Sequence, residues 1–164
     1  ECGGRRHLFE HGTDGMIDRD AIEAMIPHKH GMCLWDAVLD WDDTRIRLRT
    51  RSHAREDNPL RSDSPLHGGP VLRAVHLCEY GAQAMAVHGG LRGAVAGGPP
   101  KVGFLVALRN IALHCARIDT LPGDIEGEAE LLADSATTQQ YAFRLFHDGA
   151  LLAEGRAAVM LQES

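Results

Sequence analysis

The sequence lacks paired cysteines, a long hydrophobic run and an excess of positive charge. Its four cysteines are scattered and form no CxxC pair, so neither a zinc ribbon nor a disulfide scaffold is indicated. No apolar run approaches the roughly 20 residues that span a bilayer. The net charge of -6 provides no basic field for nucleic acid or an anionic membrane. These absences favour a protein of the reducing cytoplasm, with no membrane span and no nucleic-acid partner.

Length and composition predict a single domain. The chain has 164 residues, 44 % of them hydrophobic and 24 % charged, which is ordinary for a globular protein with a buried core. Residues 1–15 are polar, glycine-rich and aperiodic, and we expect a flexible leader there. Residues 16–164 are expected to form the domain.

The first half of that domain reads as a short helix followed by two strands. The helix is predicted from Asp18 to Met25, with Asp18 as its N-cap. Strands are predicted over 32–41 and 45–51, joined by a turn at Asp42-Asp43. A long polar loop then carries the chain to residue 69. The second strand and this loop hold a basic row, whose members are Arg45, Arg47, Arg49, Arg51 and Arg55.

A helix apolar on nearly every side is predicted from Pro70 to about His88. Residues 89–100 read as a flexible glycine-proline connection without a phosphate-binding motif. Strands follow over 103–114, 125–133, 139–147 and 150–161, and Asp148-Gly149 is a strong hairpin signal. This order predicts an α+β domain in which a curved antiparallel sheet wraps around a long central helix.

Glu79 lies in the middle of that apolar helix, in the segment HLCEYGAQAM. A carboxylate in an apolar setting is unfavourable unless it is paired, hydrogen-bonded or protonated. Gln83 follows one helical turn later and could orient it. Either Arg73, His76, Glu79 and Gln83 form a solvated helix face, or Glu79 takes part in chemistry.

Three segments in order resemble one protein family. They are IPHKHGMCLWDAVLDWDD near the start, CEYGAQAM in the helix and LPGD at residues 121–124. Together they are similar to the hotdog-fold 3-hydroxyacyl-[acyl carrier protein] dehydratases, closest to the branch associated with aryl-polyene-type pathways. The resemblance covers roughly residues 20–160. It implies the hotdog fold, dehydration of a 3-hydroxyacyl thioester to the trans-2-enoyl thioester in fatty-acid or polyene synthesis, and no cofactor.

The resemblance also implies which residues form the site. Glu79 matches the family's helix acid, and His67 is the nearest match to its loop histidine. That histidine precedes the acid by fourteen residues in the family, whereas His67 precedes Glu79 by twelve. Arg73-Ala74 replaces the family's Pro-Gly at the helix start. Supporting or substrate-binding roles are then expected for Gln83, His28, His76, Gly68, Gly69 and Ala74.

The resemblance further implies partners. An acyl carrier protein would carry the substrate, and the site would form across an interface, in a homo-oligomer or with a second hotdog protein. The basic row is either a solvated, edge-protecting strand face or a docking surface for the acidic carrier. No histidine set beyond His28-x-His30 has ligand spacing, so no metal site is expected.

Two other functions remain open. One is an acyl thioesterase on the same fold, with a carboxylate directing water at the thioester. The other is a non-catalytic hotdog subunit that completes a partner's site, which the altered loop SPLHGGPVLRA favours. Function depends on the site and not on the fold, so the fold does not choose among these.

Overall fold

The structure, a computed structural model, describes residues 16–26, 32–98 and 101–163. Within these residues, seven strands form one antiparallel sheet in the order β1-β2-β3-β7-β8-β9-β6. Their bounds are Ile17–Asp18 (β1), Ala37–Trp41 (β2), Arg45–Thr50 (β3), Lys101–Leu113 (β6), Ile125–Asp134 (β7), Thr138–His147 (β8) and Ala150–Glu163 (β9). The predicted leader at 1–15 and His28 lie outside the described residues.

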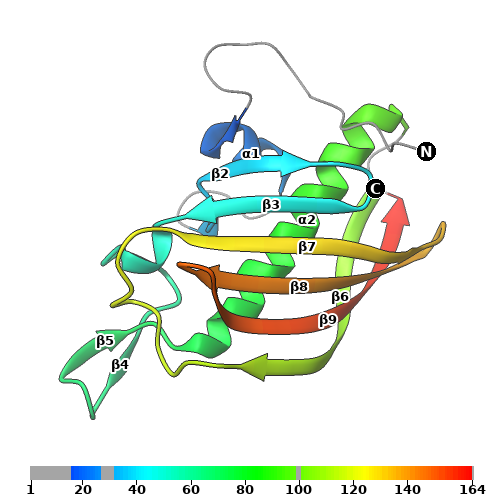
Figure 1. Cartoon of the computed structure of the whole chain (residues 1–164). Helices are drawn as coiled ribbons and strands as arrows, with labels where there is room; N and C mark the ends of the chain where they lie inside the picture. The colour runs from blue at the N-terminus through cyan, green and yellow to red at the C-terminus, as the bar shows by residue number, and fades with distance from the viewer. Residues whose placement is uncertain (1–15, 27–31, 99–100, 164) are drawn as a thin grey trace.

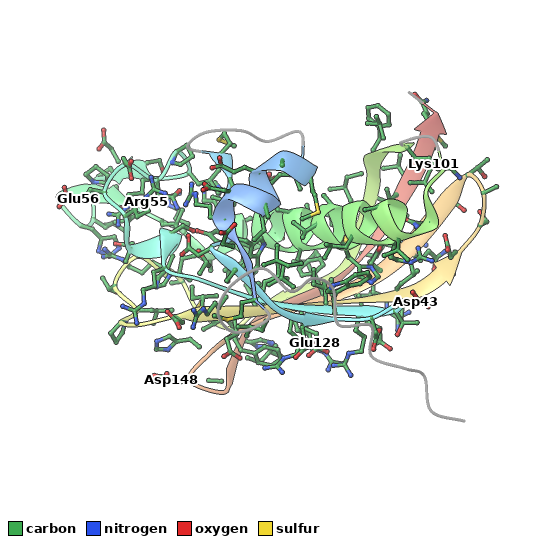
Figure 2. All side chains as sticks on the ribbon, turned by 90° about the horizontal axis from the view of Figure 1, so that it is seen from above. Asp43, Arg55, Glu56, Lys101, Glu128 and Asp148 are labelled. Atoms are coloured by element: carbon green, nitrogen blue, oxygen red, sulfur yellow. The ribbon has the colours of Figure 1, made fainter. Side chains whose placement is uncertain are left out.

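One long helix, α2 (Leu77–Ala96), packs against one face of the curved sheet (Figure 1). Figure 2 shows the same layering from above, with Glu128 of β7 on the opposite side of the sheet from α2. The short helix α1 (Arg19–Met25) begins at Asp18, whose side chain accepts the Ala21 N–H at 3.1 Å. The predicted α+β hotdog architecture and this N-cap are confirmed.

The start of α2 differs from the prediction. Pro70 does not begin a helix but lies in β5 (Gly69–Val71), and a 3-10 turn, η3 (Ala74–His76), precedes Leu77. The chain before η3 is extended at Arg73 and bonds to a neighbouring segment: the Ile118 N–H donates to Leu72 O at 2.9 Å and the Ala74 N–H to Ala116 O at 3.0 Å. These long-range bonds outweigh the local preference of proline for a helix start.

The end of α2 also differs. The helix continues through the predicted flexible segment to Ala96, and Gly97 caps it in the left-handed conformation with φ +68. Gly89 and Gly90 are tolerated because buried Val87 and Leu91 anchor this stretch and Gly90 lies against Met25 of α1. Tertiary packing overrides their weak helix propensity.

The predicted polar loop contains two further elements, the 3-10 turn η2 (Ser52–Ala54) and a small hairpin of β4 (Ser62–Ser64) with β5. This hairpin projects from the body of the domain near the start of α2 (Figure 1). The predicted Asp148-Gly149 turn is present, and both residues have positive φ, 48 and 80. That geometry matches the tight turn expected between two strands.

The basic row does not protect a sheet edge, because β3 lies between β2 and β7. Its arginines face glutamates of β7 in register, Arg45 opposite Glu130, Arg47 opposite Glu128 and Arg49 opposite Glu126. Ion pairs join Arg45 to Glu128 at 2.5 Å, Arg47 to Asp40 at 3.1 Å, Arg51 to Asp124 at 2.6 Å and Arg55 to Asp57 at 2.9 Å. Most of the row is therefore locally neutralised.

The sheet is unevenly covered. Under α2 the core is tightly packed, with Ile46, Leu48, Ala129, Tyr141 and Phe143 almost fully buried. At the opposite margin, β6 is the last strand of the sheet and curves around its end (Figure 1). Seven large apolar residues of β6 remain 37 to 57 % exposed: Val102, Phe104, Leu105, Val106, Leu108, Ile111 and Leu113.

Candidate active site

Glu79 lies in the first turn of α2 and is half-buried. This differs from the expected position further along a helix that began at Pro70. The backbone N–H groups of a first helical turn point toward the N-terminal end and create a positive potential there. A carboxylate in this turn is stabilised by that potential, and an oxyanion bound nearby would be stabilised in the same way.

Gln83, one turn later, is fully buried and hydrogen-bonded at both ends of its amide. Its Oε1 accepts the Leu34 N–H at 2.9 Å, and its Nε2 donates to Met32 O at 2.7 Å. The same Nε2 lies 3.4 Å from Glu79 Oε1. Gln83 is therefore not part of a solvated face. It fixes the segment before β2 against α2 and places an amide donor beside the Glu79 carboxylate.

A network of buried hydrogen bonds connects the start of α2 to the segment before β2, to the end of β3 and to the loop after it. Trp35 Nε1 donates to Tyr80 O at 2.8 Å, and Tyr80 Oη lies 2.9 Å from Ser52 Oγ. Asn58 Nδ2 donates to Tyr80 Oη at 3.2 Å, while the Thr50 hydroxyl donates to Leu34 O at 2.5 Å. Burial raises the pKa of the Tyr80 hydroxyl, so it stays protonated. These hydrogen bonds join the first turns of α2 to residues 32–36.

Sequence reasoning missed Thr50, Ser52 and Asn58 in this network. Ser52 lies at the start of the stretch that reads as a polar loop, and Asn58 lies within it. Both side chains are nevertheless buried. The network also explains why β2 begins at Ala37 and not at residue 32. Leu34 offers its backbone to the side chains of Gln83, Thr50 and Ser52 instead of to a neighbouring strand.

The candidate histidines are separated in the fold. His67 is exposed in the turn between β4 and β5, where its N–H and that of Gly68 both donate to Ser64 O. Gly68 has φ +68, and Gly69 begins β5. His76 directly precedes α2 and is half-buried, with its N–H bonded to Arg73 O at 3.1 Å. The Ala74 N–H is already bonded to Ala116 O.

Within the described residues, no group of histidine, cysteine and carboxylate side chains is arranged to hold a metal ion, and no helix is long and apolar enough to cross a membrane. Two surface hollows of about 240 and 250 Å³ share Asp124. Neither is lined by Glu79 or Gln83.

Comparisons with known proteins bear on the family and the fold of this chain. The sequence model of a family described as ApeP-like, ApeP dehydratase, matches residues 20–163. No curated protein sequence matches the chain.

Several solved structures share the fold. A chain of the dehydratase heterocomplex ApeI:P from Xenorhabdus doucetiae superposes with a TM-score of 0.75 at 18 % identity, covering 87 % of this chain and 91 % of that one. AziG from S. sahachiroi gives a TM-score of 0.61 at 16 % identity, with 85 % and 99 % covered. A mutant thioesterase from Pseudomonas aeruginosa gives 0.57 at 12 % identity, with 90 % and 96 % covered.

Proposed function

The chain belongs to the ApeP-like dehydratase family, and from this premise we propose that it dehydrates a 3-hydroxyacyl thioester to the trans-2-enoyl thioester. The substrate would be carried by an acyl carrier protein in polyene or fatty-acid synthesis, in the cytoplasm. The observation that carries the proposal is the carboxylate in the first turn of α2, held beside a fully buried glutamine.

The reaction removes a proton from C2 of the acyl chain and hydroxide from C3, which leaves as water. Two groups divide this work, one taking the C2 proton and the other protonating the departing oxygen. We assign the second task to the neutral carboxylic acid form of Glu79, which gives its proton to the departing oxygen and is left as a carboxylate, with Gln83 Nε2 orienting it. The positive potential at the N-terminal end of α2 would stabilise the negative charge on the thioester oxygen.

The base is a histidine, and His67 is our candidate. The projecting β4–β5 hairpin carries it outward, which suits a histidine that works in a neighbouring subunit (Figure 1). That arrangement is the one implied by the family resemblance, in which acid and histidine come from different subunits. His76, in the turn before α2, is the alternative within the same chain.

The partner would be a second hotdog subunit. The related structure from Xenorhabdus doucetiae is a heterocomplex of dehydratase chains, and the bare β6 margin of this chain leaves apolar surface for such a neighbour. The carrier protein would bind the assembled complex. Docking on the basic row is less favoured, because most of its arginines already pair with carboxylates.

An acyl thioesterase is the second candidate function. Thioesterase structures share the fold, and a carboxylate beside a glutamine amide can also position water. Mass spectrometry of a 3-hydroxyacyl carrier protein incubated with the pure chain separates the two. An enoyl product, one water lighter and still on the carrier, is expected. Release of free hydroxy acid would support the thioesterase. Turnover only after addition of a second hotdog subunit would identify a chain that supplies part of a shared site.

A further inference from the structure

Asp119 lies in the segment between β6 and β7, and its side chain is only 5 % exposed. Its Oδ1 accepts the Leu72 N–H at 3.0 Å, and the Ile118 N–H donates to Leu72 O at 2.9 Å. Both main-chain polar groups of Leu72 are therefore held by adjacent residues of one segment. We propose that Asp119 is a positioning residue for the dehydration, which acts through Leu72 to fix the β4–β5 hairpin and the start of α2 relative to each other. This inference rests on the proposed function for the roles of the side chains that these two elements carry.

Leu72 is the junction between the two elements that carry the candidate catalytic groups. The strand β5 ends directly before Leu72, and η3 begins at Ala74. The Leu72 side chain is fully buried, and the Ala74 N–H donates to Ala116 O at 3.0 Å. Figure 1 shows the segment between β6 and β7 passing the base of the hairpin and the start of α2. A shift of Leu72 would therefore move the turn that carries His67 relative to the helical turn that carries Glu79.

Arg117 orients the Asp119 carboxylate. Its Nε donates to Oδ1 at 3.0 Å and its Nη2 to Oδ2 at 2.5 Å, a two-point contact that fixes the plane of a carboxylate. The Arg117 guanidinium lowers the pKa of Asp119 to about 2, so the carboxylate is charged throughout the neutral range. Arg117 itself lies directly opposite the exposed Arg73 in an antiparallel bridge. Like charges directly opposite each other are destabilising, so Asp119 also neutralises a repulsion just after β5.

Amide hydrogen exchange of Asp119→Ala tests the contact itself. Exchange at Leu72 is expected to be at least about tenfold faster than in the wild type, because its N–H loses a buried acceptor. The Leu34 amide, which a different side chain holds, should exchange at the wild-type rate. Asp57→Ala is the matched control. It removes the same two-point arginine contact from a side chain that is 72 % exposed, and it should leave both amides unchanged.

Turnover of the same variants tests the positioning role, using a 3-hydroxyacyl carrier protein with and without a second hotdog subunit. The kcat of Asp119→Ala should fall at least about tenfold with KM within about twofold, because small displacements of catalytic groups reduce the rate of the chemical step. Asp119→Asn keeps an oxygen for the Leu72 N–H but loses the charge. Its kcat should lie between those of the wild type and Asp119→Ala, and it carries the test if the alanine variant does not fold. Ile46→Val, a core change away from the junction, lowers stability and should retain the wild-type kcat.

Three results would overturn the inference. They are unchanged exchange at Leu72 in Asp119→Ala, faster exchange there with a wild-type kcat, and an equal fall in kcat in Ile46→Val, which would assign the effect to a general loss of stability. If the wild type gives no enoyl product with or without a second hotdog subunit, the proposed function fails and the role of Asp119 fails with it. Turnover by the wild type therefore distinguishes the two failures.

Discussion

Two regions of the same face of the sheet, one under α2 and one at the β6 margin, differ in how well they are covered. Under α2, buried side chains from β3, β7 and β8 meet the helix closely: a Cβ on Gly81 would lie 2.6 Å from Phe143 Cδ2. At the β6 margin the same face of the sheet carries leucine and isoleucine side chains exposed to solvent. The covered region holds the buried core of the domain, and the bare region leaves apolar surface that the proposed partner would cover.

Replacing one phenylalanine with alanine in each region should give the largest difference in stability between them. Phe143→Ala removes a side chain that is 1 % exposed and should lower the free energy of unfolding by about 3–5 kcal/mol. Phe104→Ala on β6 removes a side chain that is 49 % exposed, and should change the free energy of unfolding by under about 1 kcal/mol. Urea denaturation of the isolated chain measures both. Similar losses at the two positions would contradict the division.

Gln83→Ala is expected to have the next largest effect. It leaves the Leu34 N–H and Met32 O without their buried partner, so the free energy of unfolding should fall by about 2–3 kcal/mol. Gln140→Ala, on the exposed face of β8, is the matched control and should be neutral. If Gln83→Ala were equally neutral, the segment before β2 would not depend on this amide.

Acidification should weaken the covered side through His88. This residue is fully buried, with Nδ1 2.7 Å from Tyr141 Oη and Nε2 2.8 Å from Asp42 O. Burial lowers its pKa, and that of buried His53, below the ordinary value of about 6.5. The unfolded chain then binds protons first as the pH falls. Stability should be highest above about pH 7 and decline below about pH 6.5, by up to about 1.4 kcal/mol per pH unit for each histidine.

The check for this pH dependence is urea denaturation at several pH values. His88→Gln should flatten the decline, while His114→Gln, an exposed position, should leave it unchanged. An identical slope in His88→Gln and wild type would assign the decline to other groups.

The smallest effect is expected on the outer face. Arg45→Gln removes an ion pair with Glu128 in which the arginine is half exposed, and should change stability by under about 1 kcal/mol. The effect should shrink further at high salt. A loss of several kcal/mol, or a clear loss of carrier-protein affinity, would give the basic row a role that its ion pairs argue against.

The fold was largely predictable because its strands alternate and its central helix is apolar. The N-cap at Asp18 and the Asp148-Gly149 turn follow from local chemistry, and the structure contains both. The ends of α2 were not predictable in this way. Pro70 lies in a strand and Gly89-Gly90 in a helix because contacts with distant segments outweigh the preferences of the residues themselves.

The site was predictable in part. Glu79 stood out as a carboxylate among apolar residues, and the family motif named it. The partners of Gln83 could not be read from the chain, because they are backbone atoms of Met32 and Leu34 some 50 residues away in sequence. The exposure of β6 was equally hidden, since an apolar alternating strand reads the same whether a partner or the core covers it.

The most direct test of the account is dehydration by Glu79→Gln against the exposed control Glu126→Gln. Both would be incubated with a 3-hydroxyacyl carrier protein, with and without a second hotdog subunit, and the loss of one water followed by mass spectrometry. We expect Glu126→Gln to match the wild type and Glu79→Gln to lose nearly all turnover while remaining folded. Full turnover by Glu79→Gln would contradict the assignment of this carboxylate to the chemistry.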